Sequence, residues 1–187
     1  MLFSVAGILA QLRRAGLPVA LDLIGGTECP TSGKRLEKIV QCEDPDGMFV
    51  HCLDHVPYAK LPDYYHNADA FIFASSCENL PNILLEAMAA GLPIACSDRG
   101  PMPEVLLDAG TYFDPEQPDE IAEALQMLIE APQLRAACAN QAYQQAQHYS
   151  WERCARETFS YLAEVAETAR EKTNDAALNH TALQSHH

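Results

Sequence analysis

The chain has 187 residues, of which 48% are hydrophobic and 20% are charged. This composition is typical of a globular protein rather than a disordered one, and the length fits one domain with a sizeable core. The formal net charge of −14 argues against a partner that needs a broad basic surface, such as nucleic acid or an anionic membrane. It does not exclude a phosphorylated ligand, which responds to local charge.

The seven cysteines form no Cys-x-x-Cys pair, and several of them fall in apolar segments. We therefore expect reduced, buried thiols in a cytoplasmic protein. The apolar start lacks the basic region of a signal peptide, and no apolar run of about 18 residues is present to span a bilayer. These features predict a cytoplasmic location and no transmembrane segment.

The first predicted element is a helix over 2–14, where apolar residues recur at helical spacing and Gly16 follows as a stop. A strand over 18–24 comes next and ends at Gly25-Gly26. Gly26 has two interpretations, which the sequence leaves open. It either lets the backbone approach a ligand closely or serves a turn that requires a positive φ.

A helix over 33–41 follows, with Thr31 or Ser32 as its expected cap, and then a strand over 48–52. Three bases lie on that helix, namely Lys34, Arg35 and Lys38. We favour a solvated helix face over a phosphate clamp for them.

Four potential metal ligands come next in the sequence, namely His51, Asp54, His55 and His66. Their spacing matches no ligand pair on one helix face, so we interpret them as polar surface residues and expect no metal site. The short helix predicted over 61–67 carries Tyr64 and Tyr65, which we expect to divide between core and surface.

The middle of the chain alternates between apolar runs and polar turns. The run 70–74 predicts a buried strand, and the polar turn 75–79 follows it. A helix opens at Pro81 and stops at Gly91, and the run 93–96 predicts a second strand. This order favours two parallel strands of one sheet.

Ligands of an open parallel sheet bind outside the carboxyl ends of its strands, where both polar turns lie. The helix at Pro81 directs free N–H groups and its positive dipole end there, which stabilises a phosphate. Glu78 precedes this helix and Glu86 lies about two turns into it, so two carboxylates can accept hydrogen bonds from hydroxyls around one anion site. The combination indicates a nucleotide that carries a sugar.

Two alternatives stay open around these turns. Ser75 and Ser76 either hydrogen-bond a phosphate or close the turn. Arg99 either approaches a phosphate or pairs with Asp98 or Glu104, and we favour the pairing.

The remaining predicted elements are a short helix near 103–104, a strand over 110–113, and helices that begin at Pro118, Pro132 and Trp151. Ser150 caps the last helix, which we expect to end near Glu171. The polar residues 172–187 predict a disordered tail, so the folded domain is expected over 1–171.

The segment Glu78-Asn-Leu-Pro-Asn-Ile-Leu-Leu-Glu86, followed by Ala-Met-Ala-Ala-Gly-Leu-Pro, resembles the Glu-x7-Glu motif of retaining GT-B glycosyltransferases. The flanking sequences Asn-Ala-Asp-Ala-Phe-Ile-Phe-Ala-Ser and Asp-Arg-Gly-Pro-Met-Pro-Glu extend the likeness. Within that class the chain is most similar to the family-four type, also described as glycosyl transferases group 1. The resemblance covers roughly 2–161 and corresponds to the C-terminal, donor-binding half of such an enzyme.

The resemblance implies an α/β fold, a Rossmann-like parallel sheet with helices on both faces. It implies that Glu86 takes the ribose hydroxyls of the nucleotide and that Glu78, the catalytic candidate, meets hydroxyls of the transferred sugar. The other residues it assigns to donor binding are Ser76, Asn79, Leu80, Pro81 and Gly26. No metal or other cofactor is expected, because such enzymes rely on the helix dipole and basic side chains.

As a family member, the chain is expected to bind a UDP- or GDP-sugar. The expected reaction is retaining transfer of a hexosyl unit to a hydroxyl acceptor in polysaccharide or glycoconjugate synthesis. The resemblance also implies that the acceptor domain, the first strand of this domain and two bases after that strand lie outside the chain. We therefore expect the chain alone to be inactive without an N-terminal-domain partner chain. The alternative is a non-catalytic nucleotide- or protein-binding module descended from such an enzyme.

Overall fold

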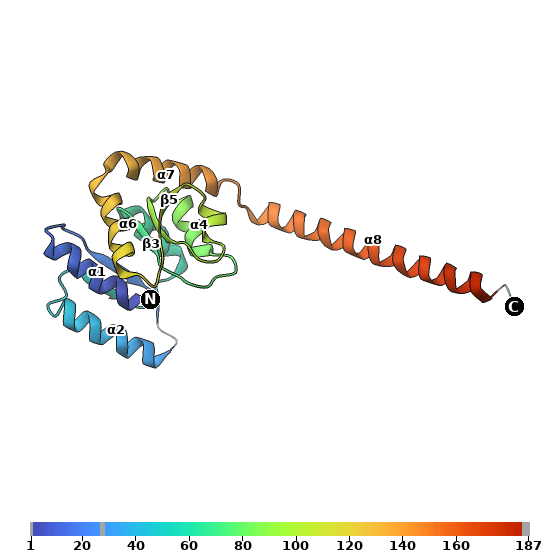
Figure 1. Cartoon of the computed structure of the whole chain (residues 1–187). Helices are drawn as coiled ribbons and strands as arrows, with labels where there is room; N and C mark the ends of the chain where they lie inside the picture. The colour runs from blue at the N-terminus through green and yellow to red at the C-terminus, as the bar shows by residue number, and fades with distance from the viewer. Residues whose placement is uncertain (1, 27–28, 185–187) are drawn as a thin grey trace. The chain divides into compact units, whose positions relative to one another are not determined.

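The computed structural model describes the backbone of residues 2–26 and 29–184 and the side chains of residues 5–26 and 29–170. The chain divides into two compact units, Met1–Gln147 and His148–His187. The first unit contains the strands and the packed helices, and the second is built on one helix, α8 (Trp151–Gln184) (Figure 1).

All strand pairs of the described residues are parallel, as predicted. One sheet pairs β1 (Leu21–Ile24) with β2 (Val50–Leu53). The other has the order β3 (Phe71–Phe73), β4 (Ile94–Ser97), β5 (Gly110–Phe113). Over the residues that the structure describes, no ladder joins β1 to β3, so the strands form two sheets rather than one.

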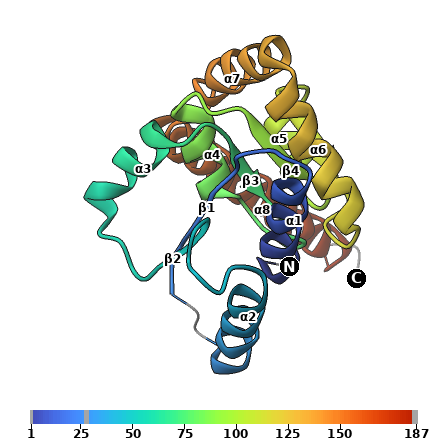
Figure 2. The same cartoon turned by 90° about the vertical axis from the view of Figure 1, so that its left-hand side faces the viewer.

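Seven helices of the first unit are described besides a 3-10 turn, η1 (Tyr58–Lys60). They are α1 (Leu2–Arg14), α2 (Pro30–Glu43), α3 (Leu61–Asn67), α4 (Asn82–Ala89), α5 (Met102–Leu106), α6 (Pro118–Glu130) and α7 (Pro132–Ala146). Helix α1 contacts α2 and α6, and α4 contacts α7 (Figure 2). Prolines begin α2, α6 and α7, because the first helical position needs no N–H donor.

The three-stranded sheet is covered on both faces. Along β4, Ile94 and Cys96 belong to one buried cluster with α4, α5 and α7, whereas Ala95 belongs to a second cluster with α1 and α6. Successive strand residues point to opposite faces, so helices flank this sheet on its two sides. The predicted α/β class with parallel strands flanked by helices is confirmed.

A buried carboxylate organises the turn before β2. Asp44 is 5% exposed, and its two oxygens accept hydrogen bonds from the backbone N–H groups of Met48, Phe49 and Val50 at 2.7–2.8 Å. Burial raises the pKa of Asp44, but the three donors and the charge of Arg13 together outweigh it, so the pKa lies below its ordinary value.

Two expectations about helix ends were wrong and one is confirmed. Helix α2 begins at Pro30 after Cys29, so neither Thr31 nor Ser32 caps it. Helix α8 continues to Gln184, past the start of the expected disordered tail, because 172–184 contains no Gly or Pro to end a helix. Ser150 does cap α8, since its Oγ accepts a hydrogen bond from the Arg153 N–H at 3.1 Å.

The expectation of buried thiols was wrong for most cysteines. All seven are free, but only Cys96 and Cys138 are buried. The exposed ones are Cys29, Cys42, Cys52, Cys77 and Cys154. An apolar sequence context did not reveal which face of an element each residue occupies.

Candidate functional site

The predicted site lies where β3 and β4 end. These strands are parallel neighbours, with Phe71 opposite Ile94, so the loops that follow them leave the same edge of the sheet. The first loop, 74–81, leads into α4, and the second, 98–101, leads into α5.

The amino end of α4 has free hydrogen-bond donors. Pro81 is the N-cap residue rather than the first helical residue, and its carbonyl accepts the Leu85 N–H at 3.1 Å. Within the described parts of the chain, the N–H groups of Ile83 and Leu84 donate to no backbone or side-chain acceptor. The first turn of α4 holds no acidic residue, so its positive dipole end is not neutralised by a side chain there. This end of α4 can therefore hold an anion.

The loop before α4 presents most of its polar groups to solvent. Ser76, Asn79 and Leu80 are exposed and Glu78 is half-buried. The Glu78 carboxylate makes no hydrogen bond or ion pair with any residue in 5–26 or 29–170, so both oxygens stay available to a ligand. Ser75 donates to the Cys77 carbonyl at 3.4 Å, which favours turn closure for that serine.

Glu86 is the best-defined side chain of the site. It is partly buried on α4, and its Oε2 accepts a hydrogen bond from the Tyr65 hydroxyl of α3 at 2.9 Å. Its Oε1 lies 3.4 Å from the Tyr58 hydroxyl of η1. Sequence reasoning missed both tyrosines, because partners 21 and 28 residues away share no element or motif with Glu86. The signal in the sequence that could have found them was the tyrosine-rich segment 58–65, between β2 and β3.

Gly26 lies at the carboxyl end of β1, in the other sheet. The positive φ that requires glycine, +122°, belongs to its neighbour Gly25, whose N–H donates to the Leu53 carbonyl. Gly26 itself is exposed, and a Cβ built there would meet nothing within 4 Å. No hydrogen bond of the described residues joins it to the loop before α4, so its part in ligand binding stays a prediction.

Arg99 is held by carboxylates. Its guanidinium lies 2.6 Å from Asp114 Oδ2 and 3.3 Å from Asp98 Oδ1. The pairing with Asp98 is confirmed, but Asp114 of the loop after β5 is the second partner, and Glu104 is not. The hydrogen bond to Asp114 raises the pKa of Arg99 and lowers that of Asp114. These two acids compete with any phosphate for this base.

Two of the candidate histidines, His51 and His66, have protein partners. His51 Nδ1 lies 2.8 Å from Asp22 Oδ1, directly across the β1–β2 ladder, and His66 Nδ1 lies 2.7 Å from the Pro62 carbonyl. Among residues that the structure describes, no three His, Cys, Asp or Glu side chains gather as a metal site would require. None of the helices in the described ranges combines the length and hydropathy needed to cross a bilayer.

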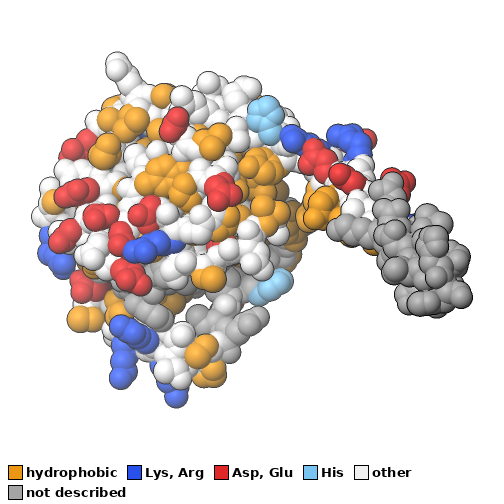
Figure 3. Space-filling view, turned by 45° about the vertical axis from the view of Figure 1, so that its right-hand side comes forward, with side chains coloured by type: hydrophobic (Ala, Val, Ile, Leu, Met, Phe, Trp, Pro, Cys, Tyr) orange, Lys and Arg blue, Asp and Glu red, His pale blue; other side chains and the backbone are white. Residues whose placement is uncertain are grey.

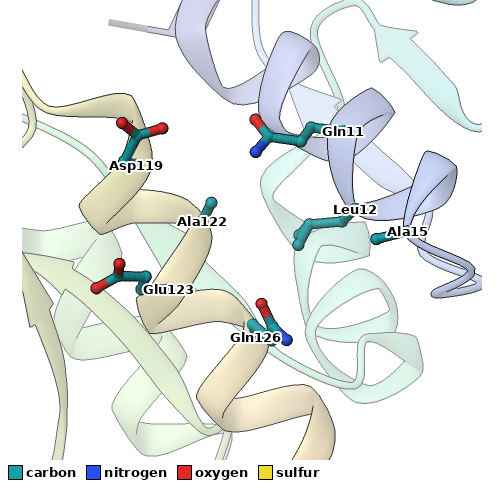
Figure 4. A pocket seen from close by; sticks show the side chains of 7 residues that line it. All are labelled: Gln11, Leu12, Ala15, Asp119, Ala122, Glu123 and Gln126. Atoms are coloured by element: carbon teal, nitrogen blue, oxygen red, sulfur yellow. The ribbon is translucent and has the colours of Figure 1, made fainter.

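A shallow depression of about 310 Å³ lies elsewhere, between α1 and α6 (Figure 4). Its lining residues are Gln11 and Leu12 of α1, Ala15 just after that helix, and Asp119, Ala122, Glu123 and Gln126 of α6. Two carboxylates and no base line it, so it disfavours a phosphorylated ligand. Asp and Glu side chains are also scattered over the face seen in Figure 3, where Lys and Arg form no broad patch.

Residues 9–145 match the family described as "Glycosyl transferases group 1". The chain belongs to this family. It is 32% identical over 112 residues to an Escherichia coli protein named O-antigen chain mannosyltransferase B, a match that covers 60% of this chain and 29% of that protein. The matches cover between 11% and 38% of the length of the curated relatives.

Solved structures show the same fold. The C-terminal domain of LpcC, a glycosyl transferase group 1 family protein from Francisella tularensis, superposes with a TM-score of 0.66 at 24% identity, covering 79% of this chain and 76% of that one. Anabaena HepE, solved in complex with UDP, has a TM-score of 0.73 at 22% identity, covering 86% of this chain and 44% of that one. The fold is therefore that of GT-B glycosyltransferases, as the resemblance implied.

Proposed function

We propose that this chain is the half of a cytoplasmic glycosyltransferase that binds the nucleotide-sugar donor. One observation carries the proposal: a partly buried carboxylate, Glu86, stands on α4 beside the free N–H groups at the start of that helix. A carboxylate suits the ribose hydroxyls of a nucleotide, and a helix start suits its diphosphate. The five exposed free thiols suit a reducing compartment and support the cytoplasmic location.

In this proposal each residue has a distinct role. Glu86 accepts hydrogen bonds from the ribose, and the backbone of Asn79, Leu80 and the α4 start binds the diphosphate. Glu78, with both carboxylate oxygens free, faces hydroxyls of the transferred sugar and stabilises positive charge that develops at its anomeric carbon. Ser76 contributes a hydroxyl contact and Gly26 a backbone contact to the nucleotide sugar.

The reaction proposed for the whole enzyme is retaining transfer of a hexosyl unit from a UDP- or GDP-sugar to a hydroxyl acceptor, in polysaccharide or glycoconjugate synthesis. The name of the E. coli relative and the UDP bound in the HepE structure support this class of substrate. No metal is part of the proposal.

Transfer itself needs an acceptor site, which we propose that an N-terminal domain supplies. The two separate sheets of the described residues support a further strand that pairs between β1 and β3 in the complete enzyme. We therefore expect the isolated chain to bind nucleotide without catalysing transfer.

The test is saturation-transfer NMR on the purified chain with UDP and with GDP. A few charge-assisted hydrogen bonds at about 1.5–3 kcal/mol each, less the cost of association, predict a Kd near 1 mM. Glu86→Ala should abolish transfer to the ribose protons, and Glu123→Ala, an exposed glutamate on α6, should leave it unchanged. Equal saturation transfer to the ribose protons in all three proteins would contradict the proposal.

A further inference from the structure

Glu86 does not hold its orientation alone. We propose that Tyr65 is a positioning residue that aims the Glu86 carboxylate at the ribose of a bound nucleotide, and that Tyr58 occupies the place of a ribose hydroxyl until the nucleotide arrives. This inference rests on the proposed function, since it assigns the residues that prepare the same site.

Tyr65 is fixed by packing. It lies on α3, contacts the buried cluster that contains α4 and β4, and its ring meets Phe71 of β3 at a centroid distance of 6.1 Å and an angle of 58°. Phe71 in turn stacks on Phe73 at 6.2 Å. A hydroxyl carried on so constrained a ring can hold its partner in one orientation.

The bond to Tyr65 leaves Glu86 free for the ligand. A carboxylate can accept about four hydrogen bonds, and Tyr65 takes one of them on Oε2. The remaining positions are one on Oε2 and, once Tyr58 has been displaced, both on Oε1, so two neighbouring ribose hydroxyls can donate to Glu86 while Tyr65 stays in place.

Tyr58 differs from Tyr65 in every respect that matters for displacement. It is 75% exposed on the 3-10 turn η1, and its hydroxyl is 3.4 Å from Oε1, longer than the usual O–H···O bond of about 2.5–3.0 Å. A long bond from an exposed side chain is weak, so an incoming ribose hydroxyl can replace it.

The protonation of Tyr65 fits this role. Burial, followed by the hydrogen bond and the charge of Glu86, raises the pKa of Tyr65 far above its ordinary value. The hydroxyl therefore stays a hydrogen-bond donor over the whole neutral and mildly alkaline range.

The test compares two ligands and four proteins by NMR titration. UDP carries both ribose hydroxyls, and 2′,3′-dideoxyuridine diphosphate lacks them. The proteins are the wild type, Tyr65→Phe, Tyr58→Phe and the control Tyr64→Phe, each variant losing one hydroxyl and keeping its ring. Tyr65→Phe should weaken UDP binding about 3- to 10-fold and leave dideoxy-UDP binding unchanged. Tyr64→Phe should change neither, and Tyr58→Phe should leave UDP binding unchanged or up to about 2-fold tighter.

Three other outcomes would each contradict one part of the proposal. If Tyr65→Phe binds UDP like the wild type, or weakens both ligands equally, Tyr65 does not act through the ribose. If Tyr58→Phe weakens UDP as much as Tyr65→Phe does, Tyr58 is not displaced by the ligand. If the wild type binds neither UDP nor GDP, the proposed function itself fails, a result distinct from the other two.

Discussion

Strand β4 is buried along its whole length, whereas β1 has a single buried residue, Leu21, and its last residue, Ile24, is 40% exposed. Parallel strands normally have both faces covered, which holds for β4 and not for β1. The difference divides the strands of the first unit into two regions. We call the well-buried region around β3, β4 and β5 the deep half and the more exposed region around β1 and β2 the thin half. The candidate site is anchored on the deep half, because Tyr65 packs against its buried cluster and Glu86 accepts a hydrogen bond from Tyr65.

The largest expected effect is on the deep half itself. Ile94→Ala removes a side chain that is 0% exposed, so it should lower the free energy of unfolding by about 2–5 kcal/mol. Ile24→Ala, the matched change on β1, should lower it by less than about 1 kcal/mol, because Ile24 already contacts water. Urea unfolding followed by circular dichroism measures both. Losses of similar size would remove the distinction between the halves.

Gly110→Ala should disturb the pairing of β4 with β5. A Cβ at residue 110 would meet the Ile94 carbonyl oxygen at 2.6 Å and Leu106 Cδ2 at 2.7 Å, so backbone must shift. We expect a loss of about 1–3 kcal/mol in the free energy of unfolding. The control is Gly7→Ala in α1, where a Cβ meets nothing within 4 Å and should stabilise the helix by up to about 1 kcal/mol. Destabilisation by both, measured in the same urea experiment, would contradict the packing described for β5.

The stability of the thin half should depend on the Asp44 carboxylate and fall at acid pH. The folded state lowers the pKa of Asp44, so this carboxylate stabilises the fold above its ordinary pKa of 3.8, and the contribution disappears as the pH falls below that value. Asp44→Asn should therefore lower the urea midpoint at pH 7 and reduce the further fall between pH 5 and pH 3. Asp46→Asn, two residues away and exposed, is the control and should match the wild type. An unchanged midpoint in Asp44→Asn would show that the turn before β2 does not depend on the carboxylate.

The smallest perturbation is alkylation of two native thiols, one in each sheet. Cys52 of β2 is exposed, whereas Cys96 of β4 is 0% exposed and burial raises its pKa to about 12. Iodoacetamide at pH 8, followed by mass spectrometry, should modify Cys52 in the folded protein and Cys96 only after unfolding. Equal rates would mean that the deep half opens as readily as the thin one.

The sequence was sufficient for the order and type of the elements. Short apolar runs between Gly, Pro and polar residues predicted each strand, and Pro118 and Pro132 marked the starts of α6 and α7 because proline fits the first helical turn. The same local signals led us to predict Glu78 and Glu86 as candidate site residues, on either side of the start of α4.

Contacts between distant elements could not be predicted in the same way. Tyr65 of α3 meets Glu86 of α4, and Arg99 meets Asp114 of another loop, only because the parallel order of the strands brings separate connections together. Nothing in the local pattern specifies which of several acids or hydroxyls a side chain will face. The exposure of Cys52 was missed for a related reason, since a short apolar strand does not reveal which of its faces is covered.

The most direct test of the nucleotide site is a ¹H–¹⁵N map of amide shifts during a titration of the isotope-labelled chain with UDP. The account predicts that the largest shifts fall on residues 75–86, that strands β1 and β2 stay unshifted, and that Glu86→Gln removes the effect. Absence of shifts in a folded wild-type spectrum with UDP and, in a parallel titration, with GDP would contradict it, as would shifts confined to the depression between α1 and α6.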